Sequence, residues 1–132
     1  MHILIVEDNK ADVFLIQEAI AGAEIKAELT VVQDGREATD IFDKADVDEK
    51  VVSPDVVLLD LNLPKKSGFE VLQHMQASKR CKHTRVVIVT SSDSAKDRAQ
   101  AQALGAHAYF RKPSDFNEFM KLGEVVAGQV GG

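Results

Sequence analysis

Hydrophobic and polar positions along the chain alternate between short apolar runs and longer segments with helical spacing. Three apolar runs are continuous, at Ile3 to Val6, Val56 to Leu59 and Val86 to Val89, and unbroken runs are typical of strands covered on both faces. Two weaker runs, Leu29 to Val32 and Ala108 to Phe110, suit the edges of a sheet. The pattern therefore predicts five strands, three of them central.

A segment with helical spacing follows each apolar run. The five predicted helices begin near Asn9, after Gly35, after Gly68, at Ser94 and near Ser114. Asp12 lies three residues after Asn9 and completes an approximate capping box. The fourth helix, 94–104, is rich in alanine and ends before Gly105, a natural helix stop. The fifth is expected to turn Phe116, Phe119 and Met120 toward the core.

Five β–α repeats with short connections predict an α/β fold, a parallel sheet between two layers of helices joined by right-handed crossovers. In open sheets of this kind, ligands bind beyond the carboxyl ends of the strands. Polar side chains follow four of the predicted strands at that edge: Glu7 and Asp8, then Asp60 and Asn62, then Thr90, and finally Lys112. The sequence therefore predicts one site at this edge.

The acidic residues of this edge predict a metal site. Two unit charges about 4 Å apart repel by roughly 4 kcal/mol at an effective dielectric near 20, so crowded carboxylates need a proton or a cation. A few hard oxygen ligands suit Mg²⁺, which keeps several waters. We expect Asp8, Asp60 and the backbone carbonyl of Asn62 to contact Mg²⁺ directly, and Glu7 to act through water.

Asp60 is the candidate nucleophile, because a carboxylate can form an aspartyl phosphate once nearby charges are neutralised. Phosphoryl transfer needs positioning and positive charge more than acid–base help. Lys112 would supply positive charge besides Mg²⁺, and the Thr90 hydroxyl would hydrogen-bond the phosphoryl oxygens. Each residue alone has an ordinary explanation, such as a helix cap, a strand end or a surface charge. Their conjunction on one edge favours the chemical explanation.

Four stretches of the chain resemble the receiver domains of two-component response regulators, and the resemblance covers nearly the whole chain. They are Ile3 to Asn9, Leu58 to Pro64, Val89 to Ser91 and Gly105 to Pro113. The resemblance implies a flavodoxin-like (βα)5 fold with strand order 2-1-3-4-5. It also implies that Asp60 is phosphorylated by a histidine kinase, and that the Lys112–Pro113 peptide bond is cis.

Three shorter stretches are similar to the small, free-standing regulators that pair with bacterial phytochromes: Glu7 to Val13, Val32 to Gly35 and Leu61 to Lys66. One departure is Ser67, where these domains usually carry Asp. The resemblance also supports a switch in which Thr90 moves toward the phosphoryl group and Tyr109 fills the vacated space. The signal would then leave through the face formed by 94–104, 108–110 and the last helix.

The composition of the chain limits the kinds of partner that it can bind. The chain has 132 residues and a net charge of −5, which argues against a general binder of nucleic acids or anionic membranes. Its single cysteine and the absence of a leader-like or spanning segment favour the cytoplasm. We expect one receiver domain over 1–132, with no effector domain, whose output is binding to another protein or to a second copy of itself.

Three other functions could use a fold of this class, but the polar residues fit each of them less well. A phosphatase of the haloacid-dehalogenase type also uses an Asp at a strand end as its nucleophile. The pattern of those enzymes has a second Asp two residues later, where this chain has Asn62. An interaction module that is never phosphorylated would not need the complete set of pocket residues. A flavin-binding protein would need a Ser/Thr/Gly-rich loop after the first strand, where this chain has acids. Each of these is disfavoured.

Overall fold

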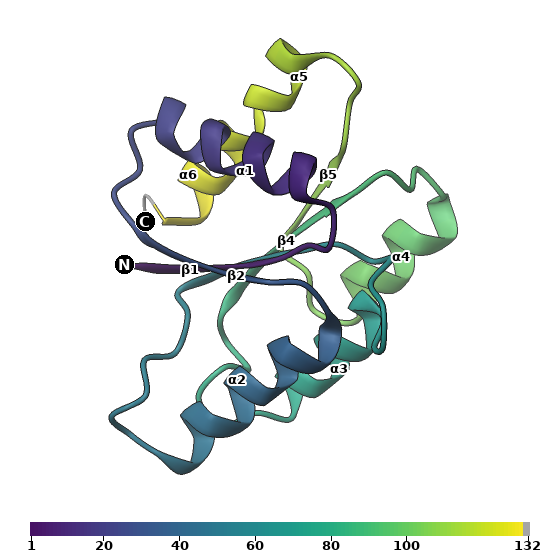
Figure 1. Ribbon diagram of the computed structural model, residues 1–132. Helices are drawn as coiled ribbons and strands as arrows, with labels where there is room; N and C mark the ends of the chain where they lie inside the picture. The colour runs from purple at the N-terminus through teal and green to yellow at the C-terminus, as the bar shows by residue number, and fades with distance from the viewer. Residues whose placement is uncertain (131–132) are drawn as a thin grey trace.

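The computed structural model describes residues 1–130, in which strands and helices alternate along the chain (Figure 1). The elements are β1 (His2–Val6), α1 (Lys10–Gly22), β2 (Glu28–Val32), α2 (Gly35–Val47), β3 (Val56–Leu59), α3 (Gly68–Gln76), β4 (Arg85–Thr90), α4 (Ala95–Ala103), β5 (Ala108–Arg111), α5 (Phe116–Met120) and α6 (Leu122–Val130). All five predicted strands are present. The last two residues of the predicted domain, 131 and 132, lie outside the described part.

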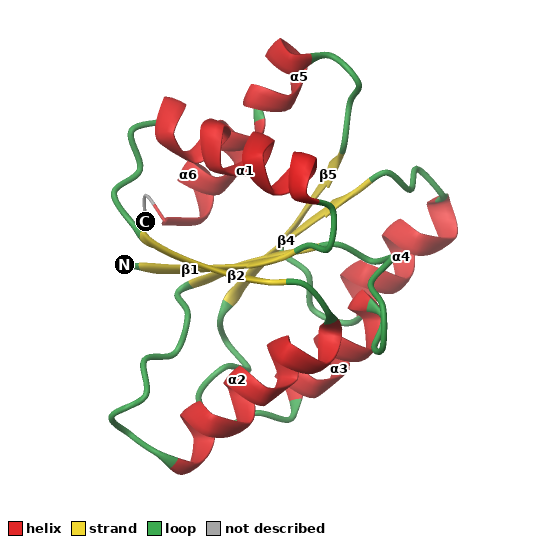
Figure 2. Cartoon of the chain, in the orientation of Figure 1, coloured by secondary structure: helices red, strands yellow, loops and turns green. Residues whose placement is uncertain are grey.

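The five strands form one parallel sheet of order β2-β1-β3-β4-β5, which confirms the predicted fold. The three continuous apolar runs are the central strands, and the two weaker runs are its edges. Helices α1, α5 and α6 cover one face of the sheet, and α2, α3 and α4 cover the other (Figure 2). The carboxyl ends of all five strands therefore meet at one edge.

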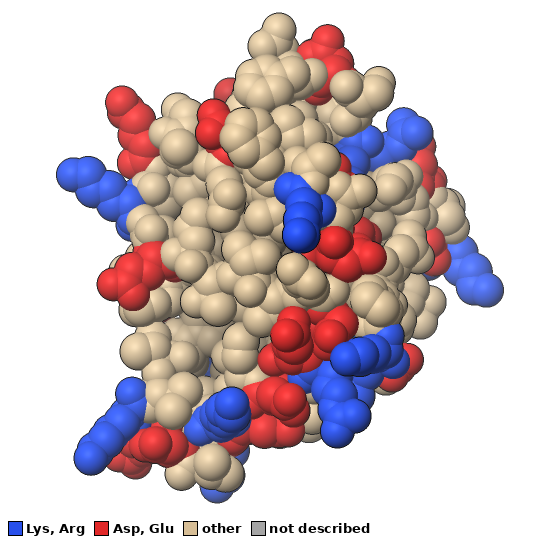
Figure 3. Space-filling view, in the orientation of Figure 1, with Lys and Arg blue, Asp and Glu red and all other residues tan. Residues whose placement is uncertain are grey.

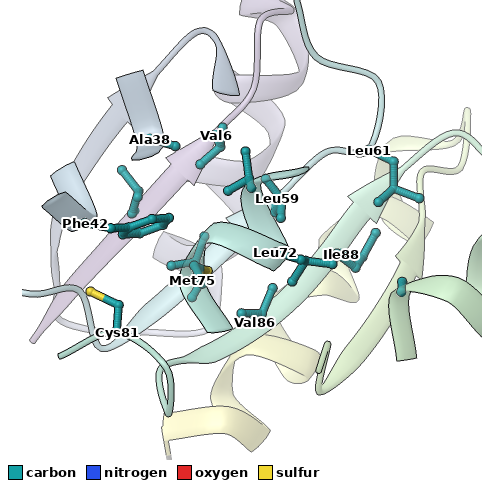
Figure 4. Packing of buried hydrophobic residues seen from close by; sticks show 14 of the residues in the cluster. Val6, Ala38, Phe42, Leu59, Leu61, Leu72, Met75, Cys81, Val86 and Ile88 are labelled. Carbon is teal, nitrogen blue, oxygen red and sulfur yellow. The ribbon is translucent and has the colours of Figure 1, made fainter. Parts of the chain in front are cut away.

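Two hydrophobic cores lie on the two faces of the sheet, because successive strand residues point to opposite sides. Leu4 and Val6 of β1 pack toward α2 and α3, whereas Ile3 and Ile5 pack toward α1 and α6. Figure 4 shows the first core, in which Phe42 of α2 and Met75 of α3 meet the sheet. Strands covered on both faces need apolar residues at every position, which explains the continuous runs.

Five helices begin with the same N-cap arrangement. The side chain of the N-cap residue accepts a hydrogen bond from the backbone N–H of an acidic residue three positions later. The pairs are Asn9 and Asp12, Asp34 and Glu37, Ser67 and Glu70, Ser94 and Asp97, and Asp115 and Glu118. Ser67 therefore does the capping that an Asp would do, which explains the departure noted in the sequence. Gly105, with φ of 99°, follows α4 as predicted.

The end of the chain differs from the prediction. The last predicted helix is two helices, α5 and α6, and the first begins at Phe116 rather than near Ser114, because Asp115 is its N-cap. Phe119 is buried as predicted, but Phe116 is 51% exposed, which is contrary to the prediction. Phe116 is the first residue of α5, and the helix turns Phe119 toward the sheet instead.

Charges of both signs are interspersed over the surface seen in Figure 3, and no area of that face is dominated by Lys and Arg. None of the helices in residues 1–130 is long and apolar enough to cross a membrane.

Candidate functional site

Backbone hydrogen bonds continue the strand pairing one residue beyond the strand ends and so fix the residues of the predicted site. Glu7 N–H donates to Val32 O at 3.0 Å, Asp60 N–H to Val6 O at 3.2 Å, and Lys112 N–H to Thr90 O at 2.8 Å. The rigid sheet therefore sets the backbone at each of these positions, as a site with defined geometry requires.

Three carboxylates converge at this edge. Glu7, Asp8 and Asp60 each offer an oxygen, and these oxygens all lie within 4.8 Å of one another. Glu7 and Asp60 are buried, whereas Asp8 is exposed to solvent. A group of hard oxygen donors that is open on one side is compatible with a divalent cation that keeps part of its hydration shell.

Lys112 lies against the same carboxylates, and its ammonium group uses all three of its protons. Nζ donates to Glu7 Oε1 at 2.6 Å, to Asp12 Oδ2 at 2.8 Å and to Asp60 Oδ2 at 3.0 Å. The lysine side chain is only 8% exposed. The structure thus brings Glu7, Asp60 and Lys112 together, and it adds Asp12, for which the sequence predicted only a capping role.

Burial and neighbouring charges shift the pKa values of this cluster. Burial raises the pKa of Glu7 to about 7, and the charge of Asp60 adds to this rise, while hydrogen bonds from Lys112 and the Asn9 backbone oppose it. Burial by itself lowers the pKa of Lys112, but hydrogen bonds to Asp12 and Glu7 and the charge of Asp60 outweigh it, so that the pKa is raised. Lys112 therefore stays charged at neutral pH, whereas Glu7 is poised between two states.

One ammonium group faces four carboxylates here, those of Glu7, Asp8, Asp12 and Asp60. If all four were ionised, the site would keep three uncompensated negative charges. Two of the four acids, Glu7 and Asp60, are buried, which makes such charges costly. Burial and, to a lesser extent, the charge of Asp60 raise the pKa of Glu7, so that protonation of this acid removes one of these charges. A divalent cation would neutralise more of them, so the donor set fits such an ion.

The loop after β3 holds Asn62 beside the site. The Asn62 backbone N–H donates to Asp60 Oδ1 at 3.2 Å, which fixes the orientation of that carboxylate. Gly68 begins α3 directly behind Asp60, where a Cβ would lie 2.4 Å from the Asp60 carbonyl oxygen. Only glycine allows this close approach. The predicted contact between the Asn62 carbonyl and a metal stays a prediction.

Thr90 and Tyr109 are linked through Ser92. Thr90 ends β4 and is fully buried, and its hydroxyl oxygen accepts a hydrogen bond from the Ser92 backbone N–H at 3.4 Å. The Tyr109 hydroxyl donates to the Ser92 carbonyl oxygen at 2.9 Å. The guanidinium of Arg98 lies 4.3 Å from the centroid of the Tyr109 ring. The sequence prediction missed both Ser92 and Arg98, because no motif marks them.

The prediction of a cis peptide bond before Pro113 is wrong, because no peptide bond between residues 1 and 130 is cis. The Lys112 backbone is already held by its hydrogen bond to Thr90 O, and its long side chain reaches the carboxylates from a trans backbone. The preference of X–Pro bonds for trans then prevails.

The family model of the response regulator receiver domain matches residues 3–123, and the chain belongs to this family. This confirms the resemblance drawn from the four sequence stretches. The protein is thus a receiver domain of two-component signalling.

Several similar proteins are response regulators, some of them with solved structures. Response regulator Rcp1 of Synechocystis is 35% identical over 120 residues, which are 91% of this chain and 82% of Rcp1. The crystal structure of the phosphorylated cyanobacterial phytochrome response regulator RcpA has a TM-score of 0.85 at 34% identity, covering 96% of this chain and 90% of RcpA. The Mn²⁺-bound form of Rcp1 has a TM-score of 0.84 at 33% identity, covering 96% and 91%. The predicted similarity to phytochrome regulators is confirmed.

Proposed function

We propose that Asp60 is the phosphoacceptor of this receiver domain and that a histidine kinase is the donor. An Asp60 carboxylate oxygen forms a bond to phosphorus while the bond between phosphorus and the imidazole nitrogen of the kinase breaks. The imidazole leaves with the electron pair and takes up a proton from solvent. The observation that carries the proposal is the position of Asp60, beside two other carboxylates and hydrogen-bonded to a charged lysine.

Glu7, Asp8 and Asp60, with the backbone carbonyl of Asn62, would hold Mg²⁺. The three side chains offer the hard oxygens that this ion prefers, and the relative Rcp1 has been solved in a Mn²⁺-bound form. When bound, Mg²⁺ would neutralise the carboxylates and the phosphoryl oxygens. Asp8 is exposed and therefore leaves the incoming donor a path to the site.

Lys112 and Thr90 complete the proposed site. The Lys112 ammonium is held next to Asp60, where it can follow the charge that develops on the phosphoryl oxygens. The Thr90 hydroxyl would donate a hydrogen bond to one of these oxygens. The chain would catalyse its own phosphorylation and dephosphorylation by these contacts, with the histidine kinase as the phosphoryl donor.

Incubation of the protein with acetyl phosphate and Mg²⁺, followed by intact mass spectrometry, tests this proposal. Wild type should gain the mass of one phosphoryl group, and Asp60→Asn should gain none. Asp40→Asn, which changes an exposed acid of α2 in the same way, is the matched control and should behave as wild type. Equal modification of wild type and Asp60→Asn would contradict the assignment.

We further propose that Thr90 and Tyr109 transmit the signal to the face formed by α4, β5, α5 and α6. When the Thr90 hydroxyl moves toward the phosphoryl group, it releases the backbone N–H of Ser92, whose carbonyl holds Tyr109. Helix α4 buries only Ala101, so it has few contacts to hold it in one place. A pocket of about 290 Å³, lined in part by Ala106 and Tyr109, lies between α4 and β5 and gives the ring room to move.

The fluorescence of the protein offers a direct test of this switch. Tyr109 is the only tyrosine and the chain has no tryptophan, so tyrosine emission reports on this one ring. Quenching by acrylamide should decrease when a phosphate mimic such as beryllofluoride is added with Mg²⁺, because the ring moves inward. Unchanged quenching, with the mimic shown to bind, would contradict the switch.

The partners follow from this account. The kinase would be phytochrome-like, since the relative RcpA is described as a phytochrome response regulator. The output would be contact with another protein or with a second copy of the chain in the cytoplasm. The receiver domain would thus act through its surface.

A further inference from the structure

The geometry points to Asp12 as a positioning residue: we propose that Asp12 holds Lys112 at the site while Mg²⁺ occupies the carboxylates of Glu7 and Asp60. This inference rests on the proposed function of Asp60. It goes beyond it because it gives a role in phosphorylation to a residue outside the metal site.

The contacts of Lys112 set the problem. An ammonium group has three donors, and here each is taken by a different carboxylate, those of Glu7, Asp12 and Asp60. Glu7 and Asp60 also belong to the group of acids that could hold a metal. A divalent ion bound there would draw on the same two carboxylates as Lys112. Among residues 1–130, Asp12 is the one side-chain partner of Lys112 that lies outside this group.

The first turn of α1 leaves the Asp12 carboxylate free for this contact. In a complete capping box, the acid three residues after the N-cap accepts the N-cap backbone N–H. Here the Asn9 backbone N–H donates instead to Glu7 Oε2 at 3.1 Å. Only the other half of the box is present, in which the Asp12 backbone N–H donates to Asn9 Oδ1. The Asp12 side chain therefore reaches Lys112 rather than its own helix.

The burial of the partners agrees with a holding role. The Lys112 side chain is 8% exposed, and those of Glu7 and Asp60 are 1% and 7% exposed, whereas that of Asp12 is 24% exposed. Asp12 thus lies at the rim of the site, next to solvent. With a metal bound, Asp12 keeps Lys112 from leaving the pocket, so the ammonium is in place when the phosphoryl donor arrives.

The rate of phosphorylation by acetyl phosphate at saturating Mg²⁺ tests this role. Asp12→Asn should slow phosphorylation of Asp60 roughly tenfold, the loss expected for one hydrogen bond to a charged group. Asp12→Glu should recover part of the rate. Glu18→Gln removes an exposed carboxylate from the same helix and should keep the wild-type rate. A wild-type rate for Asp12→Asn would overturn the proposal.

A double-mutant cycle with Lys112→Met separates a positioning role from a general structural one. If Asp12 acts through Lys112, then Asp12→Asn should cause no further slowing in the Lys112→Met background. The same tenfold loss in both backgrounds would overturn the proposal. Failure of the proposed function is distinct, since wild type itself would then carry no phosphoryl group on Asp60, and the inference would fall with it.

Discussion

The acidic pocket and the α4–β5 face differ in how firmly their side chains are held. In the pocket, the protons of Lys112 are all taken by carboxylates, and backbone hydrogen bonds fix Glu7, Asp60 and Lys112 on the strands. On the α4–β5 face, Tyr109 is held by one hydrogen bond to a loop carbonyl and by the stacked Arg98. Chemistry needs the first arrangement, and a switch needs the second.

The two regions meet at the end of β4. Thr90 is buried and its hydroxyl touches Ser92, whose carbonyl accepts from Tyr109. In the proposed switch, a change at the rigid pocket would be passed to the loosely held face through this loop. Phosphorylation adds roughly 1.5–2 negative charges, and new hydrogen bonds to it of about 1.5–3 kcal/mol each are large enough to shift an equilibrium of that face.

The largest effect is expected at Lys112. Replacing it in Lys112→Met removes the positive charge next to Asp60, the proposed phosphoacceptor. The rate of phosphorylation by acetyl phosphate should fall about 10²-fold, as when one donor is removed from an oxyanion site. Time-resolved intact mass spectrometry gives the rate. Lys121→Met, which changes an exposed lysine between α5 and α6, is the control and should react as wild type does.

Glu7 should make the metal-free protein lose stability as pH rises. Its ordinary pKa near 4.5 applies when unfolded, and its pKa is raised to about 7 when folded, so the folded state binds the proton more tightly. The stabilisation is complete below pH 4.5 and is lost as pH rises through about 7.

Urea unfolding with a chelator present measures this effect. The free energy of unfolding should fall by about 1–3 kcal/mol more in wild type than in Glu7→Gln between pH 4.5 and pH 8. Parallel pH dependences of the two proteins would mean that Glu7 has an ordinary pKa.

Adding a side chain to a glycine in the wall of the pocket should destabilise the protein, whereas adding one on an open helix surface should not. Gly68→Ala places a Cβ against the Asp60 carbonyl oxygen and should lower the free energy of unfolding by about 1–3 kcal/mol. Gly128→Ala in α6 meets nothing within 4 Å, and it should instead raise stability by about 0.5–1 kcal/mol. Thermal denaturation measures the stability of both variants. Equal shifts of their melting temperatures would show that the structure around Gly68 can accommodate a Cβ.

The smallest effect is expected at Arg98. Arg98→Ala removes the cation stacked on Tyr109 and should cost about 0.5–1 kcal/mol of stability. The rate of phosphorylation should stay within about twofold of wild type, because Arg98 lies outside the pocket. Acrylamide should quench Tyr109 fluorescence more strongly in this variant. Slow phosphorylation of Arg98→Ala would show that the reaction in the pocket depends on contacts of the α4–β5 face.

The sheet was predictable because its signal is local and repeated. Strands buried on both faces require unbroken apolar runs, and the order of the strands followed from the family resemblance. Glu7, Asp60 and Lys112 could be placed at one edge because each directly follows a strand. The topology of the sheet thus converts positions in the sequence into neighbours in space.

The features that the sequence did not predict depend on side-chain choices between alternatives. Asp12 fits a capping box by its spacing, and only the structure shows that Glu7 takes the Asn9 backbone N–H and frees Asp12 for Lys112. Phe116 has helical spacing from Phe119 but is exposed at the first position of α5. Such competition between partners leaves no trace in the pattern of residues.

The site of phosphorylation can be read most directly by reducing the acyl phosphate with borohydride, which converts a phosphorylated aspartate to homoserine, and then mapping the peptides by mass. The account predicts that homoserine is found at position 60 alone, and that a chelator of Mg²⁺ abolishes it. Homoserine at position 8 or 12, or a modification at position 60 that persists without the metal, would contradict it.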